Sequence, residues 1–260
     1  MTGLREIWQT DGSALGVWLS VASTVTAEAS ARQGFDYVCV DTQHGAVEYQ
    51  AAVAMFQAIE LGGGTPIARV PWNEQGIIGK MLDAGAQGVI VPMVNTREQA
   101  EAVVRSCRYA PEGSRSFGPT VAAMRQADYV GWAGTSIAVI PMIETTEALA
   151  NLDDIMSVPG IDAIYVGPAD LSLSLGLKPR NNDGEALFDD ALKAITDACG
   201  RHDVVPGIHA SGALAGKRLD QGFRMITVAN DLLALRGGLI AELEAARKAG
   251  ADGTDTASPY

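Results

Sequence analysis

Cysteine is rare in this chain, and so are long apolar stretches and basic runs. The three cysteines (Cys39, Cys107 and Cys199) lie far apart and form no CxxC pair, which argues against a disulfide framework and a zinc site. No stretch reaches the roughly 18 apolar residues that a membrane helix needs, and the first residues lack the basic and apolar parts of a signal peptide. These absences predict a soluble, cytoplasmic protein with reduced thiols and no membrane partner.

Positively charged residues are also few. The 260 residues include 19 lysines and arginines against 31 acids, which gives a formal net charge of −12. Such a chain is a poor candidate for binding nucleic acid or an anionic membrane, because both depend on basic surface. An anionic substrate would need a locally placed positive charge or a metal ion.

Several catalytic motifs are missing. No GxGxxG follows the first apolar run, no P-loop spacing occurs, and no GxSxG is present, so dinucleotide, nucleotide and serine-hydrolase sites have no support. A Schiff-base aldolase needs a desolvated lysine at the end of a strand. The five lysines do not end any apolar run (Lys80, Lys178, Lys193, Lys217 and Lys248). This pattern favours metal-assisted chemistry over imine chemistry.

The chain does contain a regular alternation of short apolar runs and helix-forming segments. Most runs are continuous, as in parallel strands that are buried on both faces. Eight runs occur, at 15–20, 36–41, 66–71, 88–94, 137–144, 161–167, 205–210 and 225–231. Eight β–α units in a chain of this length predict an α/β fold, a single (β/α)8 TIM barrel over 1–250, with a polar tail at 251–260.

One connection, at 95–136, is longer than the others. After one clear helical segment it reads PEGSRSFGPTVAAMRQADYVGWAG, for which we expect a loop and an extra helix over the mouth of the barrel. A doubly wound open sheet is the main alternative fold, and the missing GxGxxG disfavours it.

Ionisable residues follow the apolar runs directly. Glu144 ends the fifth run and Asp170 follows the sixth. Because the carboxyl ends of barrel strands meet at one rim, we expect these side chains to lie together. Two carboxylates without cysteine or histidine form an oxygen site that suits Mg²⁺ or Mn²⁺. The alternative is that each acid caps a helix or occupies its first turn.

Asp41 and His44 follow the second run with the spacing DxxH. A carboxylate beside an imidazole can fix its tautomer and raise its basicity, which would produce a general base. The alternative is a structural histidine in the loop. Asp83 is a further acid that could support His44, although a solvated helix acid is the simpler interpretation.

Arg69 ends the third run as an isolated cation. Its guanidinium could pair with a substrate carboxylate or an enolate oxygen, or it could form a salt bridge with Asp41 or Glu144. The segment VGPAD at 166–170 offers backbone N–H groups at a helix start, and Gly167 would let a substrate come close. His209 ends the seventh run, but nothing specific in the sequence supports a role for it.

These motifs together resemble one family. FDYVCVDTQHG, ARVPWN, MLDAGAQGVIVPMVNTREQAE, RYAPEGSRSFG, PMIETTEAL and IDAIYVGPADLSLSLG occur in the order found in HpcH/HpaI aldolases, class II metal-dependent pyruvate aldolases. The resemblance spans about 15–235 and implies a phosphoenolpyruvate/pyruvate-type barrel. It also implies a homohexamer, a trimer of dimers, in which the last helix, here 232–248, is exchanged between subunits.

The resemblance implies a role for each site residue. Glu144 and Asp170 correspond to the metal ligands, His44 to the general base tuned by Asp41 and Asp83, and Arg69 to the group that stabilises the enolate. The backbone at Gly167, Ala169 and Asp170 corresponds to the cradle of the 2-oxo acid carboxylate. The implied cofactor is Mg²⁺ or Mn²⁺, with Co²⁺ as a further possibility.

The chain departs from the family pattern at two places. Met142 stands where many members carry a glutamine that precedes the metal glutamate by two residues, and a thioether cannot donate a hydrogen bond. Arg115-Ser116-Phe117-Gly118 replaces the common RGxG. Both changes bear on which substrate is used rather than on the reaction type.

The expected reaction is reversible cleavage of a 4-hydroxy-2-oxo acid into pyruvate or hydroxypyruvate and an aldehyde. An acyl-CoA lyase similar to the citrate lyase β-chain is one alternative, although no basic patch for CoA phosphates is evident. A catalytically silent barrel that serves as a binding protein is another.

Overall fold

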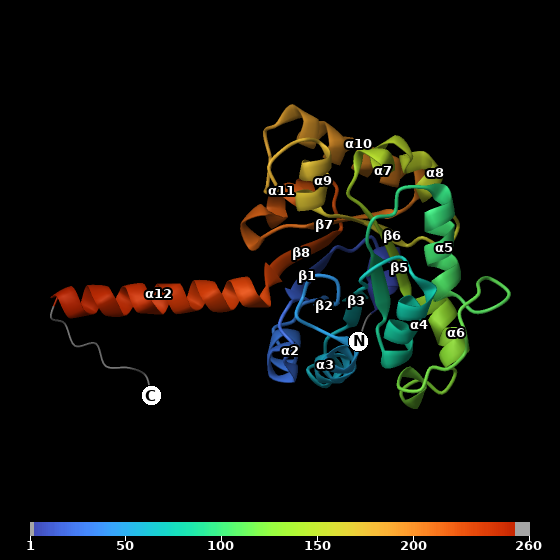
Figure 1. Cartoon of the computed structure of the whole chain (residues 1–260), viewed down its shortest axis with the longest axis horizontal. Helices are drawn as coiled ribbons and strands as arrows, with labels where there is room; N and C mark the ends of the chain where they lie inside the picture. The colour runs from blue at the N-terminus through green and yellow to red at the C-terminus, as the bar shows by residue number, and fades with distance from the viewer. Residues whose placement is uncertain (1–2, 253–260) are drawn as a thin grey trace.

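Eight parallel strands close into a barrel in the order β1 to β8, as the sequence predicts (Figure 1). The computed structural model describes residues 3–252. The strands are β1 (Ala14–Leu19), β2 (Tyr37–Asp41), β3 (Pro66–Arg69), β4 (Gly88–Val91), β5 (Ala138–Ile143), β6 (Ala163–Val166), β7 (Val205–His209) and β8 (Met225–Asn230). All eight predicted strands are present, and most of the tail predicted at 251–260 lies outside the described residues.

Most of the helices lie around the barrel and cover the outer face of its strands, whereas the first and the last do not. They are α1 (Leu4–Gln9), α2 (Thr24–Ala31), α3 (Tyr49–Leu61), α4 (Gln75–Ala84), α5 (Arg97–Cys107), η1 (Ala122–Met124), α6 (Tyr129–Ser136), α7 (Thr146–Ala150), α8 (Leu152–Met156), α9 (Pro168–Ser174), α10 (Ala186–His202), η2 (Gly212–Leu214), α11 (Ala215–Asp220) and α12 (Asp231–Asp252). None of these helices has the length and apolar character needed to cross a membrane.

Two tyrosines fill the barrel interior opposite glycines. Gly16 pairs with Tyr37 across β1 and β2, and Gly207 pairs with Tyr165 across β6 and β7. A Cβ built on Gly16 would fall within the Tyr37 ring, and one on Gly207 would lie 3.0 Å from Cδ2 of Tyr165. The absent side chains therefore create the space that the two buried rings occupy.

The N-terminal end of the barrel is closed by α1. Leu4 and Trp8 are buried in the same apolar cluster as the inward-facing strand residues. Arg5 forms an ion pair with Asp162, which directly precedes β6, and donates a hydrogen bond to the carbonyl of Gly134 in α6.

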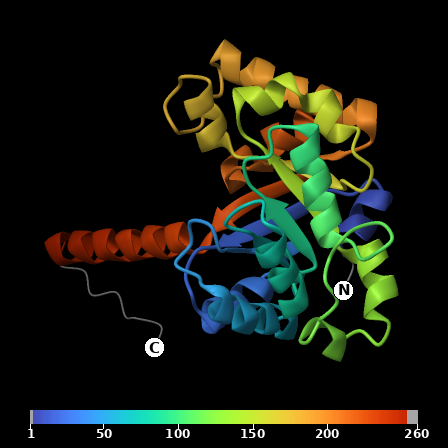
Figure 2. The same ribbon diagram turned by 45° about the vertical axis from the view of Figure 1, so that its right-hand side comes forward.

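The long connection lies elsewhere than predicted. Instead of covering the mouth, it follows the outside of α4, where Gln75 bonds to Ser114 and the N–H of Val121 donates to the carbonyl of Asp83. Its extra helix, α6, contacts α1 at the opposite end of the barrel (Figure 2). The local sequence predicts a loop and a helix correctly, but their location depends on packing against distant elements.

The fourth strand is shorter than its apolar run. The run extends over 88–94, whereas β4 ends at Val91 because Met93 adopts a φ of 56°. This left-handed conformation is uncommon for a residue with a side chain and marks a position that tertiary contacts impose.

Helix α12 leaves the body of the barrel. In both views it projects away from the other helices, and among the described elements it contacts β1 and β8 (Figures 1 and 2). Asp231 anchors its start by accepting the N–H groups of Ser20 and Val21 at 2.9 and 3.0 Å.

We expect Gly16→Ala to destabilise the barrel by about 3 kcal/mol, because the added methyl overlaps the Tyr37 ring in a closed interior. Gly79→Ala is the matched control, since Gly79 lies in α4 with nothing within 4 Å of its Cβ position. The control should leave stability unchanged or raise it. Urea unfolding checks both variants, and equal midpoints would contradict the proposed crowding.

Candidate active site

A cavity of about 630 Å³ opens at the carboxyl ends of the strands. His44, Arg69, Met142, Gly167 and Asp170 all line it, so the structure brings together most of the residues that the sequence singled out. They come from the ends of β2, β3 and β6 and from the inward face of β5. The rim therefore brings together reactive side chains from strands that are far apart in the sequence, as in other barrels of this type.

Asp41 and Arg69 form a buried ion pair. The register places Asp41 of β2 beside Arg69 of β3, and the guanidinium donates from Nε to Oδ1 at 2.8 Å and from Nη2 to Oδ2 at 2.6 Å. The Arg69 guanidinium also lies 4.9 Å from the centre of the Trp18 ring. Of the alternatives that the sequence left open for Arg69, the salt bridge with Asp41 is observed.

The acid–imidazole pair predicted from DxxH is not formed among the described residues. Oδ1 of Asp41 instead accepts the backbone N–H groups of Gln43 and His44, at 3.1 and 3.3 Å. Burial opposes ionisation of Asp41, but the bonds from Arg69, together with Trp18 and Gln43, outweigh it and lower the pKa of this carboxyl. Asp41 thus holds the loop that carries His44, while the His44 side chain is exposed at the cavity.

Glu144 is a nearly buried acid directly after β5. Its side chain accepts the N–H of Met93 at 2.7 Å, which is the bond that the left-handed conformation of Met93 makes possible. Burial raises the pKa of Glu144 to about 7, with a further contribution from the charge of Asp170 and opposition from Met93 and Arg69. The helix-cap alternative does not apply here, because Thr145 caps α7.

Asp170 lies in the first turn of α9, beside the same cavity. The first-turn position agrees with the helix-acid alternative and does not conflict with ligation. Gly167 separates α9 from the strand, and a Cβ there would lie 2.5 Å from Oε2 of Glu144. A side chain at 167 would therefore displace the Glu144 carboxylate from its position.

The structure does not bring Asp83 to His44 within one chain. Asp83 lies near the end of α4, whereas His44 follows the carboxyl end of β2, so the two residues are at opposite ends of the barrel wall. Its carboxylate accepts Nη2 of the buried Arg115 at 2.6 Å, and the Arg115 guanidinium stacks on Tyr109. Residues 115–118, where the chain differs from the RGxG pattern of the family, thus lie on the outside of this barrel.

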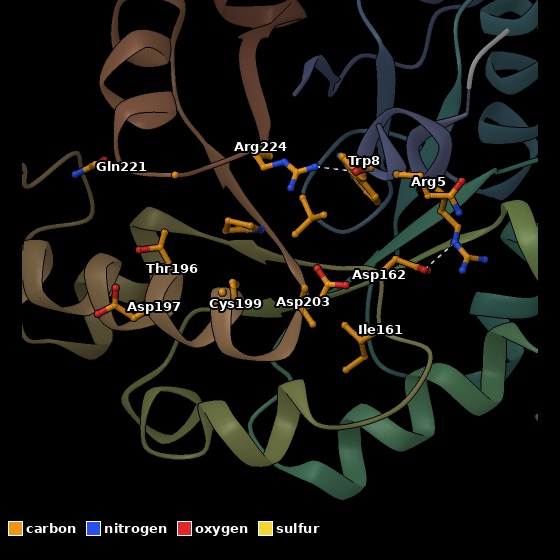
Figure 3. Close-up of a pocket in the computed structure, with 16 residues that line it drawn as sticks. Arg5, Trp8, Ile161, Asp162, Thr196, Asp197, Cys199, Asp203, Gln221 and Arg224 are labelled. Atoms are coloured by element: carbon orange, nitrogen blue, oxygen red, sulfur yellow. Dashed lines mark hydrogen bonds and ion pairs between the residues drawn. The ribbon is translucent and has the colours of Figure 1, made fainter. Parts of the chain in front are cut away.

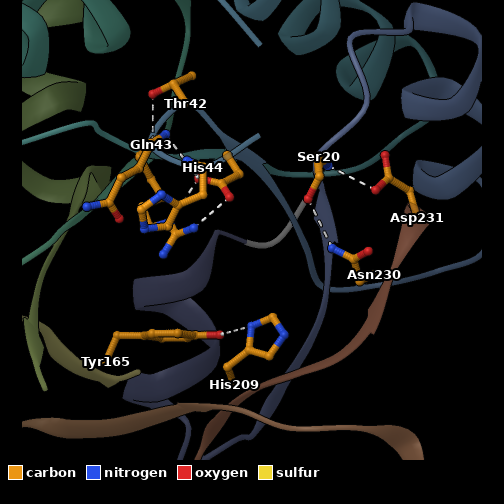
Figure 4. A network of polar contacts seen from close by, with 10 residues as sticks. Ser20, Thr42, Gln43, His44, Tyr165, His209, Asn230 and Asp231 are labelled. Carbon is orange, nitrogen blue, oxygen red and sulfur yellow. Dashed lines mark hydrogen bonds and ion pairs between the residues drawn. The ribbon is translucent and has the colours of Figure 1, made fainter. Parts of the chain in front are cut away.

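Sequence reasoning missed or undervalued several residues of the site. Trp18 lines the cavity from β1, and His209 of β7 and Tyr165 of β6 line it side by side (Figure 4). The sequence shows that these residues lie in or at the end of apolar runs. A continuous apolar run does not show which of its side chains face the barrel interior.

A second hollow, of about 510 Å³, lies at the other end of the barrel (Figure 3). Its arginines are already paired, Arg5 with Asp162 and Arg224 with Asp11, and the Arg224 side chain also donates to the carbonyl of Trp8. The charges there hold α1 in place, so the rim cavity is the candidate active site.

Comparison with known proteins agrees with this geometry. Residues 14–236 match the family model described as HpcH/HpaI aldolase/citrate lyase. The hydroxypyruvate/pyruvate aldolase of Rhizorhabdus wittichii is 40% identical over 237 residues, covering 90% of this chain and 94% of the relative. The 2-dehydro-3,6-dideoxy-6-sulfogluconate aldolase of Pseudomonas putida is 39% identical over 226 residues, covering 84% of this chain and 86% of the relative.

A solved structure shares the fold over almost the whole chain. It is an HpcH/HpaI aldolase/citrate lyase family protein from Burkholderia cenocepacia J2315, with a TM-score of 0.88 and 29% identity, and the match covers 95% of this chain and 100% of that one. The fold and family expected from the sequence are confirmed. The chain belongs to the HpcH/HpaI aldolase/citrate lyase family and is an enzyme of the carbon–carbon lyase class.

Proposed function

We propose that this chain catalyses the reversible cleavage of 4-hydroxy-2-oxo acids into pyruvate or hydroxypyruvate and an aldehyde. The observation that carries the proposal is that Asp170, Arg69 and His44 line one cavity, and that the buried carboxylate of Glu144 is close enough to Asp170 and Arg69 to interact with their charges. The similarity to relatives named as aldolases supports the same reaction class.

The donor set fits a divalent metal. Glu144 is kept partly protonated by burial and by the charge of Asp170, and a cation between them would relieve that repulsion. Both ligands are carboxylates, which suits Mg²⁺ or Mn²⁺, with Co²⁺ also able to occupy such a site. When bound, the metal would act as a Lewis acid that makes the C3 protons of a 2-oxo acid easier to remove.

The residues of the chain then supply orientation and proton transfer. Two nitrogens of Arg69 are held by Asp41, so the guanidinium is fixed with Nη1 left to face an enolate oxygen. The first-turn N–H groups of Ala169 and Asp170 have no acceptor within α9 and can bind the substrate carboxylate. Gly167 lets that carboxylate approach closely.

His44 is placed to move the aldol proton. In the cleavage direction a ring nitrogen of His44 accepts the proton of the C4 hydroxyl as the C3–C4 bond breaks, which gives the aldehyde and the enolate of the 2-oxo acid. In the addition direction the same nitrogen returns a proton to the new alkoxide. Asp41 contributes by fixing the His44 backbone and Arg69, not by contacting the imidazole.

The alternative functions have less support. An acyl-CoA lyase would need a basic surface for CoA phosphates, and a silent binding barrel would not need both acids, the arginine and the imidazole at one cavity. Met142, buried at the cavity wall, offers the substrate an apolar contact, so it shapes the donor site without donating a hydrogen bond.

We also propose that α12 packs on a second copy of the chain, in a hexamer built as a trimer of dimers. Large apolar side chains lie exposed along α12 at helical spacing: Leu232, Leu235, Leu239 and Leu243, flanked by Leu233 and Ile240. A helix of 22 residues that is about 33 Å long is not stable in water without a partner for such a stripe.

Pyruvate should exchange its C3 protons with solvent in the presence of Mn²⁺, and EDTA should abolish this exchange. Proton NMR in deuterated buffer measures it without any aldehyde or CoA. Arg69→Ala should slow exchange by about 10²-fold or more, since it removes a fixed cation from the developing oxyanion. Full exchange in EDTA would contradict the metal, and near-normal kinetics of Arg69→Ala would contradict the role of the guanidinium.

The stability of the metal-free protein should fall as the pH rises through 7. The pKa of Glu144 is raised on folding from 4.5 to about 7, so the folded chain binds this proton more tightly than the unfolded chain. Its contribution is complete below pH 4.5 and is lost as the pH passes through 7, by about 3 kcal/mol. Glu144→Gln should flatten this loss in thermal unfolding in EDTA, whereas Glu147→Gln, an exposed acid in α7, should keep the wild-type slope. Identical slopes in all three proteins would contradict the assignment.

Replacing Leu235 and Leu239 with glutamate should break the assembly, because the charges would lie within the buried stripe. Light scattering after size exclusion should give an oligomer for the wild type and a smaller species for the double variant. Glu242→Lys and Glu244→Lys serve as charge-changing controls on the same helix. A wild-type monomer at micromolar concentration would overturn the assembly.

A further inference from the structure

His209 lines the active-site cavity but has no part in the mechanism described above. It is the last residue of β7, and its side chain shares the cavity with His44, Arg69 and Asp170. Trp18 contacts the ring edge-on, with centroids 5.2 Å apart and an interplanar angle of 82°. The contact with Trp18 therefore fixes the imidazole on the cavity wall, in contrast to a mobile surface side chain.

A chain of hydroxyl groups favours one tautomer of His209. Tyr165, which contacts His209 (Figure 4), donates to Oγ1 of Thr227 at 2.6 Å, and the same Oγ1 bonds to Tyr37 at 2.9 Å. A phenol has a single hydrogen, so Tyr165 presents a lone pair to Nδ1 of His209, 3.5 Å away. This contact favours the tautomer with the ring hydrogen on Nδ1, which leaves Nε2 as an acceptor without a partner among residues 3–252.

The surroundings keep this ring neutral. Burial and, to a smaller extent, the charge of Arg69 lower the pKa of His209 to about 4, and Asp41 partly opposes both. A neutral ring whose Nε2 is an acceptor attracts a hydrogen-bond donor and does not attract an anion. The complementary ligand group is therefore a hydroxyl.

The position of His209 indicates which part of the substrate carries that hydroxyl. In the proposed function Arg69, Gly167 and Asp170 bind the 2-oxo acid, and Trp18 contacts both the Arg69 guanidinium and the His209 ring. The aldehyde has to bind in the same cavity beside the 2-oxo acid. His209 therefore places an imidazole acceptor within reach of the aldehyde's own substituent.

We propose that His209 is a specificity-determining residue that selects aldehydes with a hydroxyl next to the carbonyl, by accepting that hydroxyl's hydrogen bond at Nε2. The proposal rests on the proposed aldolase function and extends it to the class of acceptor. A site built to pair a hydroxyl discriminates against the analogue that lacks it, because the buried acceptor would then remain unpaired.

The test compares glycolaldehyde with propanal, which has a methyl group in place of the hydroxyl. With pyruvate and Mn²⁺, the wild type should prefer glycolaldehyde in kcat/KM, and His209→Leu should reduce that preference about tenfold by losing one hydrogen bond. The kcat/KM for propanal should change less than threefold. His209→Gln, whose amide oxygen can reach near the place of Nε2, should retain part of the preference.

The pyruvate exchange assay separates the two proposals. Wild-type protein without exchange would refute the aldolase function itself, whereas exchange that persists in His209→Leu shows an intact donor site. With exchange intact, an unchanged ratio of the two aldehydes would overturn the role of His209. An equal loss for both aldehydes in the leucine and glutamine variants would assign it a structural role instead.

Discussion

The ion pair between Asp41 and Arg69 is the interaction on which the site depends. Their side chains are only 3% and 11% exposed, so removing either one would leave a buried charge without its partner, at a cost of about 3–5 kcal/mol. The same carboxylate accepts the backbone N–H of His44. One acid at the end of β2 therefore positions both the cation and the imidazole, and it does so across two strands that the barrel already holds in register.

This pairing also sets the charge of the cavity. Because Asp41 compensates Arg69, the acids Glu144 and Asp170 leave negative charge beside the ion pair, and burial, together with the charge of Asp170, raises the pKa of Glu144. A chain with a net charge of −12 can thus handle an anionic 2-oxo acid without a broad positive field. Local groups suffice: one oriented guanidinium, the N–H groups at the start of α9 and a cation between two acids.

The sequence predicts the barrel and the rim because both follow from local patterns. Continuous apolar runs identify buried parallel strands, and the residue at the end of each run must lie near the common rim, where the structure has Arg69 in the cavity lining and Glu144 directly after β5. The local pattern does not reveal which side chains pair with one another. The DxxH spacing allows an Asp41–His44 pair equally well, and only the register of β2 against β3 selects Arg69. The left-handed turn at Met93 is likewise imposed by Glu144, 51 residues away.

The two ends of the cavity separate reaction type from substrate choice. The inner end is built of charges that depend on one another, so a change at Arg69 or Glu144 alters the chemistry as a whole. The remaining lining combines apolar side chains with polar ones, and His209, at the end of β7, is the imidazole among them that the proposed mechanism does not use. The Tyr165–Thr227–Tyr37 chain below it is satisfied within the barrel interior. A substitution at 209 can therefore change which aldehyde fits while the ion pair, the acids and the barrel core keep their geometry.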